Sequence, residues 1–386
     1  MLLRTIAKGL GIVLCALLVL VVIGVGASSV ARAQARQLAA PTGPSAVGRI
    51  ELALTDLARV DPFLSDGHAR ELAVWIWYPT GKSSAGAAAP YLPKAWADAA
   101  NSVNGLAAVL FQDNNAVRTN SIASAPLEGK SPPVVVLMPG LGNSIAEYTE
   151  LAEDLASHGY AVVGINPTGS STVVGFPDGH LVYATPKGSI AETNIDAWYA
   201  TASRLVGVWV DDASFVVSAL TKSPPSVGAL DFSRVAYVGH SLGGNASFEA
   251  CARDSRCIAA VDLDGTIFSQ VRRTGLKVPG LILQANNKVS CDEFCQRRKD
   301  DFKGLTMSGP VRDLAMNGAE HLNFSDNGVL FMPLLRPVGQ LGSIDGARGG
   351  LITRDVVRAF VDQEIRGAPT STFDATVERY AEVHAP

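Results

Sequence analysis

The chain has 386 residues, 47% of them hydrophobic, and a formal net charge of −4. This length suits one large domain or two ordinary ones, and the composition is sufficient for a sizeable buried core. The charge balance is slightly acidic and no run of lysine or arginine occurs, so the chain lacks the basic surface of nucleic-acid-binding proteins. We therefore expect no nucleic-acid partner.

Residues 1–35 have the pattern of a targeting segment. Arg4 and Lys8 precede an uncharged apolar run over residues 9–27, and two Ala-x-Ala patterns end at Ala33 and Ala35. We expect a signal peptide cleaved near Ala35 and a periplasmic or secreted protein. The apolar run is nearly long enough to cross a bilayer, so an uncleaved membrane anchor over residues 9–27 is the alternative.

Residues 36–46 are rich in Ala, Pro, Gly and Ser and predict a flexible linker, followed by a single catalytic domain over residues 47–386. Gly48–Thr55 and Arg70–Tyr78 alternate apolar and polar residues, as antiparallel strands with one solvated face do. Further on, the apolar stretch Leu106–Phe111 predicts a helix that packs on the core. The alternative is that this helix covers the site or makes a peripheral membrane contact.

From residue 133 onward the apolar runs no longer alternate, as expected for parallel strands covered on both faces. These runs are Val134–Met138, Ala161–Ile165, Ser233–Val238, Ile258–Leu263, Gly280–Gln284 and Val311–Met316. Helices are expected after a Ser144/Glu147 capping box, over Ile190–Leu220 and over Val356–Ile365, with a long loop over Asn166–Lys187. The alternation predicts an α/β fold with a doubly wound, mostly parallel sheet and antiparallel N-terminal strands, in which sites lie beyond the carboxyl ends of the parallel strands.

The run Gly239-His240-Ser241-Leu242-Gly243 lies between a predicted strand and a predicted helix. Gly-x-Ser-x-Gly in that context predicts a nucleophile elbow, a sharp turn that exposes the serine hydroxyl above the sheet. Gly239 and Gly243 would let strand and helix pass where a Cβ would clash. The alternative is a glycine-rich turn with an incidental serine.

In this fold the histidine that acts as general base comes after both the nucleophile and the acid along the chain. Only His321 and His384 come after Ser241. His384 lies in a tail that we expect to fray, whereas His321 lies in a loop after the last predicted strand, so we predict His321 as the base. His240 adjoins the nucleophile but is expected to point elsewhere.

Two aspartates are candidates for the acid that contacts the histidine. Asp262 and Asp264 both lie at the end of the strand that follows the elbow. Asp264 begins a turn with Gly265 and can be aimed back at the histidine, so it is preferred. Asp262 is deeper in the strand and is expected to be a buried acid hydrogen-bonded to loop amides.

An oxyanion hole needs two backbone N–H groups. We predict those of Leu242, the residue after the nucleophile, and of Leu141 in the loop after the first parallel strand. Such chemistry requires no metal and no cofactor.

Four cysteines lie beyond the N-terminal segment, an even number that suggests disulfides in an exported protein, although four allow three pairings. The short loops favour Cys251–Cys257 and Cys291–Cys295. The alternative is four reduced thiols, and a zinc site is disfavoured because no histidine joins either pair at ligand spacing.

Several motifs together resemble the plasma-type platelet-activating-factor acetylhydrolase group of α/β-hydrolases and its bacterial relatives. They are Val74-Trp75-Ile76-Trp77-Tyr78-Pro79, Pro139-Gly140-Leu141-Gly142, Leu155-Ala156-Ser157-His158-Gly159-Tyr160, the elbow, Leu263-Asp264-Gly265 and His321-x-Asn323-Phe324. The resemblance runs from about Val47 to Gly367. It implies the α/β-hydrolase fold and an acid after the strand next to the elbow, which supports Asp264. Pro139 stands where the family usually has histidine, a difference that leaves the amide of Leu141 in place.

The resemblance also implies a serine esterase that works through an acyl-enzyme. We expect an exported hydrolase of short-acyl esters or of short-chain or oxidised phospholipids, with a small-molecule or lipid ester as its partner. One alternative is hydrolysis of a polyester or another bulky ester. An alternative of a different class is a non-catalytic binding protein with this fold, which the complete Ser241, Asp264 and His321 set disfavours.

Overall fold

The computed structural model describes residues 36–386 except 104–112, 287–295, 298–299, 302–308 and 331–334. The predicted signal or anchor over residues 1–35 and the apolar stretch Leu106–Phe111 therefore lie outside the described residues. None of the described helices combines the length and apolar character needed to cross a membrane.

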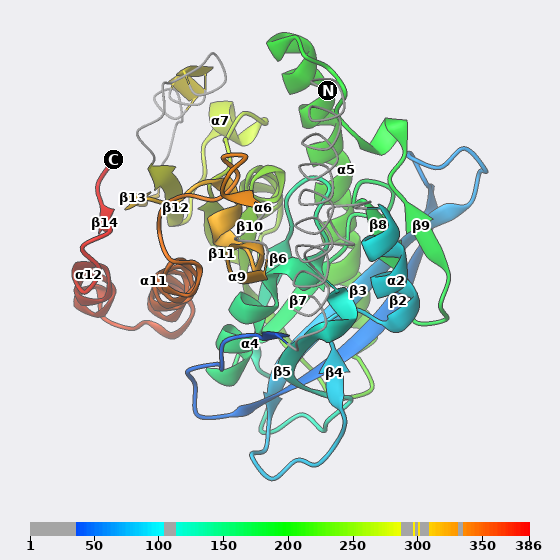
Figure 1. The fold of residues 1–386 in the computed structure, drawn as a ribbon, viewed down its shortest axis with the longest axis horizontal. Coiled ribbons are helices and arrows are strands. Elements are labelled where there is room, and N and C mark those ends of the chain that lie inside the picture. The colour runs from blue at the N-terminus through cyan, green and yellow to red at the C-terminus, as the bar shows by residue number, and fades with distance from the viewer. Residues whose placement is uncertain (1–35, 104–112, 287–295, 298–299, 302–308, 331–334) are drawn as a thin grey trace, which may run out of the picture.

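A twelve-stranded sheet runs through the middle of the molecule in the order β1-β5-β2-β3-β7-β6-β10-β11-β12-β13-β14, with β4 beside β5 (Figure 1). Its strands are β1 (Arg36–Gln37), β2 (Ala46–Val60), β3 (Ala69–Thr80), β4 (Ala88–Pro90), β5 (Val117–Ala123), β6 (Pro133–Met138), β7 (Ala161–Ile165), β10 (Asp231–His240), β11 (Cys257–Leu263), β12 (Gly280–Asn286), β13 (Val311–Asn317) and β14 (Val383–His384). Neighbours from β7 to β13 are parallel, whereas β2 and β3 are antiparallel to each other and β3 is antiparallel to β7. The predicted mostly parallel sheet with antiparallel N-terminal strands is confirmed.

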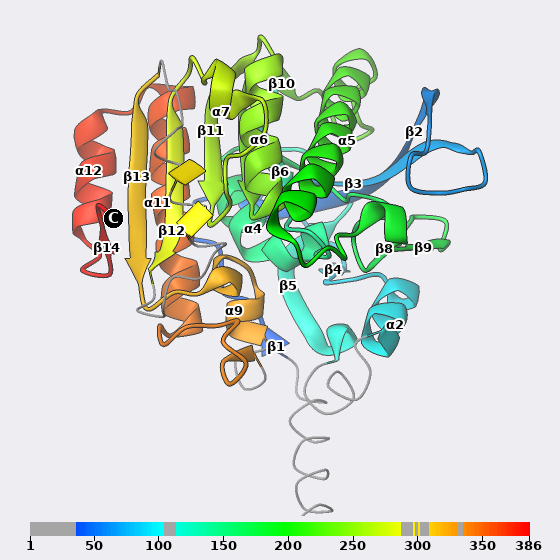
Figure 2. The same cartoon turned by 90° about the horizontal axis from the view of Figure 1, so that it is seen from above.

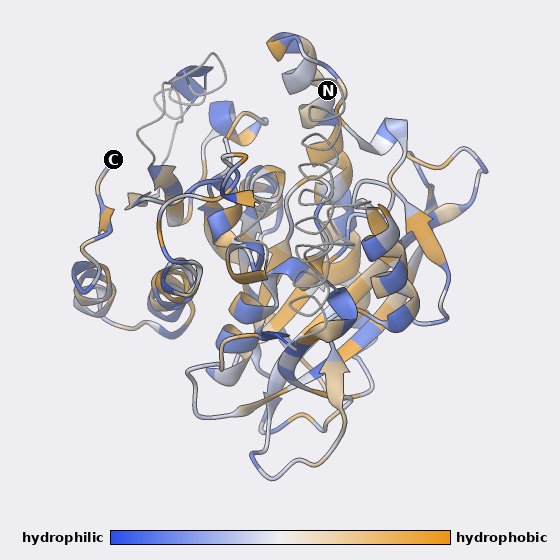
Figure 3. Ribbon diagram, viewed as in Figure 1, coloured by the Kyte–Doolittle hydropathy of each residue, from blue (hydrophilic) through white to orange (hydrophobic). Residues whose placement is uncertain are grey.

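Helices cover both faces of the sheet. The longer ones are α2 (Lys94–Val103), α4 (Thr149–Ser157), α5 (Ile195–Lys222), α6 (Leu242–Arg253), α11 (Gly346–Arg366) and α12 (Thr370–Glu378). Side chains of α5 and α6 form one core with one face of the strands, and those of α4, α11 and α12 form a second core with the other face. Figure 2 shows β11, β12 and β13 running side by side, with α12 to their left and α6 and α5 to their right, and Figure 3 shows that hydrophobic residues are concentrated along the central strands. Burial on both faces explains why strands such as β6 are continuously apolar.

Some segments differ from the sequence-based expectation. Residues 36–46 are not a free linker, because Leu38 is buried and the backbone N–H of Thr42 donates to Asp154 on α4. The tail does not fray either, since His384 pairs with Ala315 at the edge of the sheet. The expected long loop over Asn166–Lys187 contains a short hairpin, β8 (Val173–Gly175) and β9 (Leu181–Tyr183). These differences were not predicted because the segment either pairs with residues far away in the sequence or is too short to show a periodic pattern of hydrophobic residues.

A disulfide joins Cys251, near the end of α6, to Cys257 at the start of β11. This pairing was predicted from the short loop between the two cysteines and is confirmed. Cys291 and Cys295, the other predicted pair, lie outside the described residues.

Candidate active site

The elbow is built where β10 ends and α6 begins. Ser241 is the residue between them, with φ 57° and ψ −124°, a backbone conformation that L-residues rarely adopt. A Cβ on Gly239 would lie 2.1 Å from the carbonyl oxygen of Gly243, and one on Gly243 would lie 2.3 Å from that of Pro139. The close approach that the two glycines were predicted to permit is confirmed.

His321 follows β13 and begins a 3-10 turn, His321–Phe324. Its Nε2 atom lies 2.9 Å from the hydroxyl oxygen of Ser241, and its Nδ1 atom lies 2.7 Å from Oδ2 of Asp264. Because a carboxylate can only accept, Nδ1 carries the proton and Nε2 is left to accept the serine hydroxyl. The side chain of His321 is 41% exposed and that of Asp264 only 3%, so the ring is reachable while its partner is shielded from water.

The structure separates the two candidate acids. Asp264 has φ 50°, and its Oδ1 atom accepts the N–H of Ala285 at 2.9 Å while Oδ2 faces His321. Asp262 is fully buried, and its Oδ1 atom accepts the N–H of Gly265 at 2.9 Å. Asp264 is therefore the acid that touches the histidine, and Asp262 holds the backbone of the turn that carries it.

The predicted oxyanion donors are two backbone N–H groups, one in the loop after β6 and one at the start of α6. Within the described part of the chain, those of Leu141 and Leu242 donate to no protein acceptor. Leu242 is the first residue of α6, where the helix dipole favours negative charge. The loop that carries Leu141 is held because Gly142 accepts the N–H of Thr172 at 2.9 Å.

The ring of His240 is directed towards Tyr148 and the backbone of His321, and this role was not predicted from its place next to Ser241. Its ring is buried, with Nδ1 2.8 Å from the hydroxyl of Tyr148 and Nε2 2.8 Å from the backbone oxygen of His321. Burial, and next the charge of His321, lower the pKa of His240 to about 3. Tyr148 and His240 are 92 residues apart, so no local spacing could have revealed their contact.

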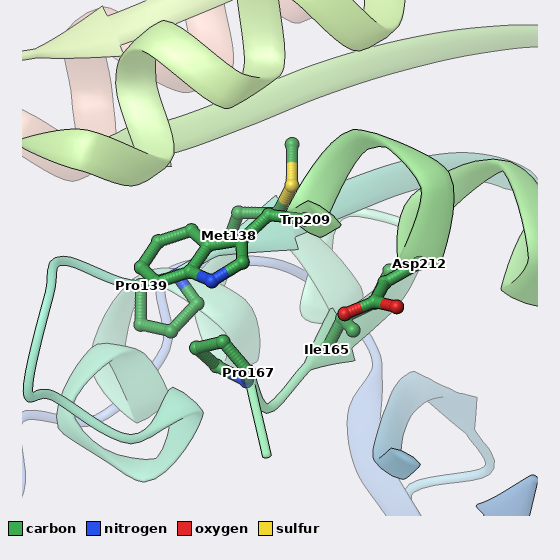
Figure 4. A pocket seen from close by; sticks show the side chains of 6 residues that line it. All are labelled: Met138, Pro139, Ile165, Pro167, Trp209 and Asp212. Carbon is green, nitrogen blue, oxygen red and sulfur yellow. The ribbon is translucent and has the colours of Figure 1, made fainter. Parts of the chain in front are cut away.

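A small cavity lies behind the loop that carries Leu141. Its walls are Met138, Pro139, Ile165, Pro167, Trp209 and Asp212 (Figure 4). Its volume of about 10 Å³ is close to the minimum for a single water molecule, so it is too small for a substrate. A larger cleft of about 740 Å³ adjoins the loop that precedes His321, which contributes Gly318 and Glu320 to its wall.

No family model matches the chain. It is 25% identical over 147 residues to a probable 1-alkyl-2-acetylglycerophosphocholine esterase of Arthroderma benhamiae, a match that covers 37% of this chain. It is 22% identical over 259 residues, 61% of this chain, to a platelet-activating factor acetylhydrolase of Cavia porcellus. The chain spans only 34% and 57% of the lengths of these two relatives.

Among solved structures, a ferulic acid esterase from Streptomyces cinnamoneus superposes with a TM-score of 0.77 at 32% sequence identity. That match covers 90% of this chain and 98% of the esterase. The same fold and this level of identity extend over almost all of the solved protein.

Proposed function

Because the chain belongs to the α/β-hydrolase esterases related to platelet-activating-factor acetylhydrolase, we propose that Ser241, His321 and Asp264 are its catalytic triad. The observation that carries the proposal is the unbroken hydrogen-bond line from Ser241 through the ring of His321 to Asp264, with contacts of 2.9 and 2.7 Å. These are the distances at which a histidine can accept a serine proton.

The reaction follows from this line. His321 takes the hydroxyl proton as Ser241 attacks the ester carbonyl, and the amides of Leu141 and Leu242 stabilise the oxyanion. The alcohol leaves with a proton from His321, and an acyl-enzyme remains on Ser241. Water, deprotonated by the same ring, then attacks the acyl-enzyme and releases the acid. Asp264 keeps the ring in the required tautomer and stabilises the imidazolium.

The first candidate substrate class is a short-acyl ester, including short-chain or oxidised phospholipids. It is supported by the two curated relatives, whose names specify an acetylated glycerophosphocholine esterase and a platelet-activating factor acetylhydrolase. Contact with a lipid surface is part of this candidate.

The second candidate is a bulky aromatic ester. Phe268 follows Asp264 in the same loop, and its ring centroid lies 5.0 Å from that of Tyr199 and 6.1 Å from that of Trp198. All three residues are half-buried, and Trp198 and Tyr199 belong to the first turns of α5. Edge-to-face rings of this kind offer an aromatic group a surface to pack against. The solved esterase, whose title names ferulic acid, supports the same candidate.

We also propose that the protein is exported. The targeting pattern of residues 1–35 and the disulfide between Cys251 and Cys257 support this, because disulfides persist in oxidising compartments. A protein processed near Ala35 in the periplasm or medium is expected, with anchoring by residues 9–27 as the alternative.

The test is hydrolysis of chromogenic acetate, butyrate and octanoate esters, of methyl ferulate and of a short-chain phosphatidylcholine. Ser241→Ala should lower kcat by up to about a millionfold with an unchanged melting temperature. An organophosphonate should label the peptide that contains Ser241. A Ser241→Ala protein that keeps a tenth of the wild-type turnover would overturn the proposed triad, and the preferred substrate decides between the two candidates.

A further inference from the structure

The ring of His240 joins two parts of the active site that come from different strands. Nε2 lies 2.8 Å from the backbone oxygen of His321, in the turn after β13. Nδ1 lies 2.8 Å from the hydroxyl of Tyr148, and that hydroxyl lies 3.0 Å from the N–H of Gly140, in the loop after β6. The line therefore runs from the residue before Leu141 to the backbone of the proposed base.

Each hydrogen bond in this line has one possible direction. The oxygen of His321 can only accept, so Nε2 of His240 must carry the proton. With the ring neutral, Nδ1 accepts the O–H of Tyr148. The hydroxyl oxygen of Tyr148 in turn accepts the N–H of Gly140. The contacts thus determine the tautomer of His240.

The surroundings of His240 are packed tightly enough to make these contacts specific. The residue is 1% exposed, and its ring centroid lies 4.5 Å from that of His321 and 6.4 Å from that of Phe324. A Cβ on Gly140 would lie 3.0 Å from Nδ1 of His240 and 3.3 Å from Cβ of Ser241. The loop therefore lies directly against both residues. A neutral His240 also places no positive charge beside the imidazolium that forms on His321 during the reaction.

We propose that His240 and Tyr148 are positioning residues, which together fix the backbone of His321 relative to the loop that supplies the Leu141 amide. Neither residue touches the reacting atoms. The proposal rests on the proposed triad and assigns roles to two residues outside it. They keep the base and the oxyanion donor at a fixed distance from each other. Their loss should therefore weaken stabilisation of the transition state more than binding of the substrate.

The experiment compares three variants with wild type on one chromogenic acetate ester. His240→Gln keeps an N–H near the position of Nε2, whereas His240→Phe keeps a ring and loses both hydrogen bonds. Tyr148→Phe removes only the hydroxyl. We expect His240→Phe and Tyr148→Phe to lower kcat by about 10- to 100-fold with KM changed by less than about twofold, because small displacements of catalytic groups cost this much. His240→Gln should keep more activity than His240→Phe.

The order of the two His240 variants separates positioning from packing, since a role in packing alone would favour Phe. Tyr160→Phe is the matched control: it removes a buried hydroxyl that donates to Asp362 on α11 and should leave kcat unchanged. Melting temperatures show that each protein is folded at the assay temperature. Wild-type kcat in both Tyr148→Phe and His240→Phe, or a Phe variant as active as the Gln variant, overturns the proposal. An active Ser241→Ala would instead overturn the triad itself.

Discussion

The Oδ1 atom of Asp262 lies 1.7 Å from the position that a Cβ on Gly244 would occupy. Gly265 also lies against this oxygen, since its own Cβ would lie 2.2 Å from it. The carboxylate thus fills the space between the first turn of α6 and the turn that carries Asp264. Asp262 and Asp264, two residues apart, serve different neighbours: one a backbone amide and the other the ring of His321.

Substitution by asparagine should therefore lower activity at Asp264 and stability at Asp262. Asp264→Asn should lower kcat by up to about ten-thousandfold, because the amide favours the wrong tautomer of His321, with little change in melting temperature. Asp262→Asn should reduce the free energy of unfolding by roughly 1–3 kcal/mol, since it perturbs a fully buried hydrogen bond, and should change kcat far less. The measurement is kcat and melting temperature for both proteins in parallel. A catalytically dead Asp262→Asn with an active Asp264→Asn would reverse the assignment.

The neutral burial of His240 makes stability depend on pH. Its pKa is lowered to about 3, mainly by burial, whereas an unfolded histidine titrates near 6.5. Between these values the unfolded chain binds one more proton, so this residue makes the protein less stable as the pH falls from about 6.5 towards 3. His240→Gln should remove that contribution, about 1.4 kcal/mol per pH unit in this window.

Urea unfolding at pH 7, 6 and 5 measures this effect. The variant should gain stability relative to wild type as the pH falls. His68→Gln is the control. The ring of His68 is exposed and its pKa is raised by a hydrogen bond to Asp66, so this variant should not gain stability as the pH falls. Parallel stability curves for wild type and His240→Gln would show that folding does not lower the pKa of His240.

The disulfide should matter for stability and not for chemistry. Replacing both Cys251 and Cys257 by serine should reduce the free energy of unfolding by roughly 2–3 kcal/mol, because the unfolded chain regains the entropy of the opened loop. The value of kcat should stay the same, since the bond lies at the far end of α6 from Ser241. Thiol titration of denatured, non-reduced protein provides the direct check: modification at either cysteine in exported material contradicts the pairing.

A buried ion network lies at the start of β3. Arg70, which is fully buried, contacts Asp61 at 2.8 Å and Asp212 at 2.7 Å, and also donates to the backbone oxygen of Thr168. Asp212→Ala should reduce the free energy of unfolding by about 3–5 kcal/mol, because a buried arginine loses a partner. Lys94→Ala breaks the exposed pair with Asp98 and should reduce the free energy of unfolding far less, because water screens both charges. Equal losses in chemical denaturation would show that burial does not set the strength of these pairs.

The parallel strands and the elbow could be predicted because their signals are local. An apolar run such as Val134–Met138 reflects burial on both faces, and the two glycines of the elbow reflect backbone contacts within a few residues of Ser241. His321 and Asp264 could be predicted to lie near Ser241 because the fold fixes their order along the chain. The structure brings all three into contact.

Features that depend on remote contacts could not be predicted in this way. The pairing of His240 with Tyr148 joins side chains from different elements, and nothing in either local sequence indicates it. The packing of residues 36–46 depends on acceptors on α4, such as Asp154, whose availability only the folded arrangement determines. The strand β2 continues to Val60, beyond the expected end at Thr55, through an irregular pairing after Asp56 that the alternation of residues does not encode.

The positive φ angles of Ser241 and Asp264, 57° and 50°, restrict which amino acids either position can accept. Aspartate tolerates this region better than most residues, whereas a β-branched side chain is strongly disfavoured there. Threonine at position 241 would add strain of about 1–3 kcal/mol despite carrying the same hydroxyl group. Cysteine is unbranched and close to serine in size, so this turn accommodates a thioester intermediate on Ser241→Cys with less strain than an acyl-threonine.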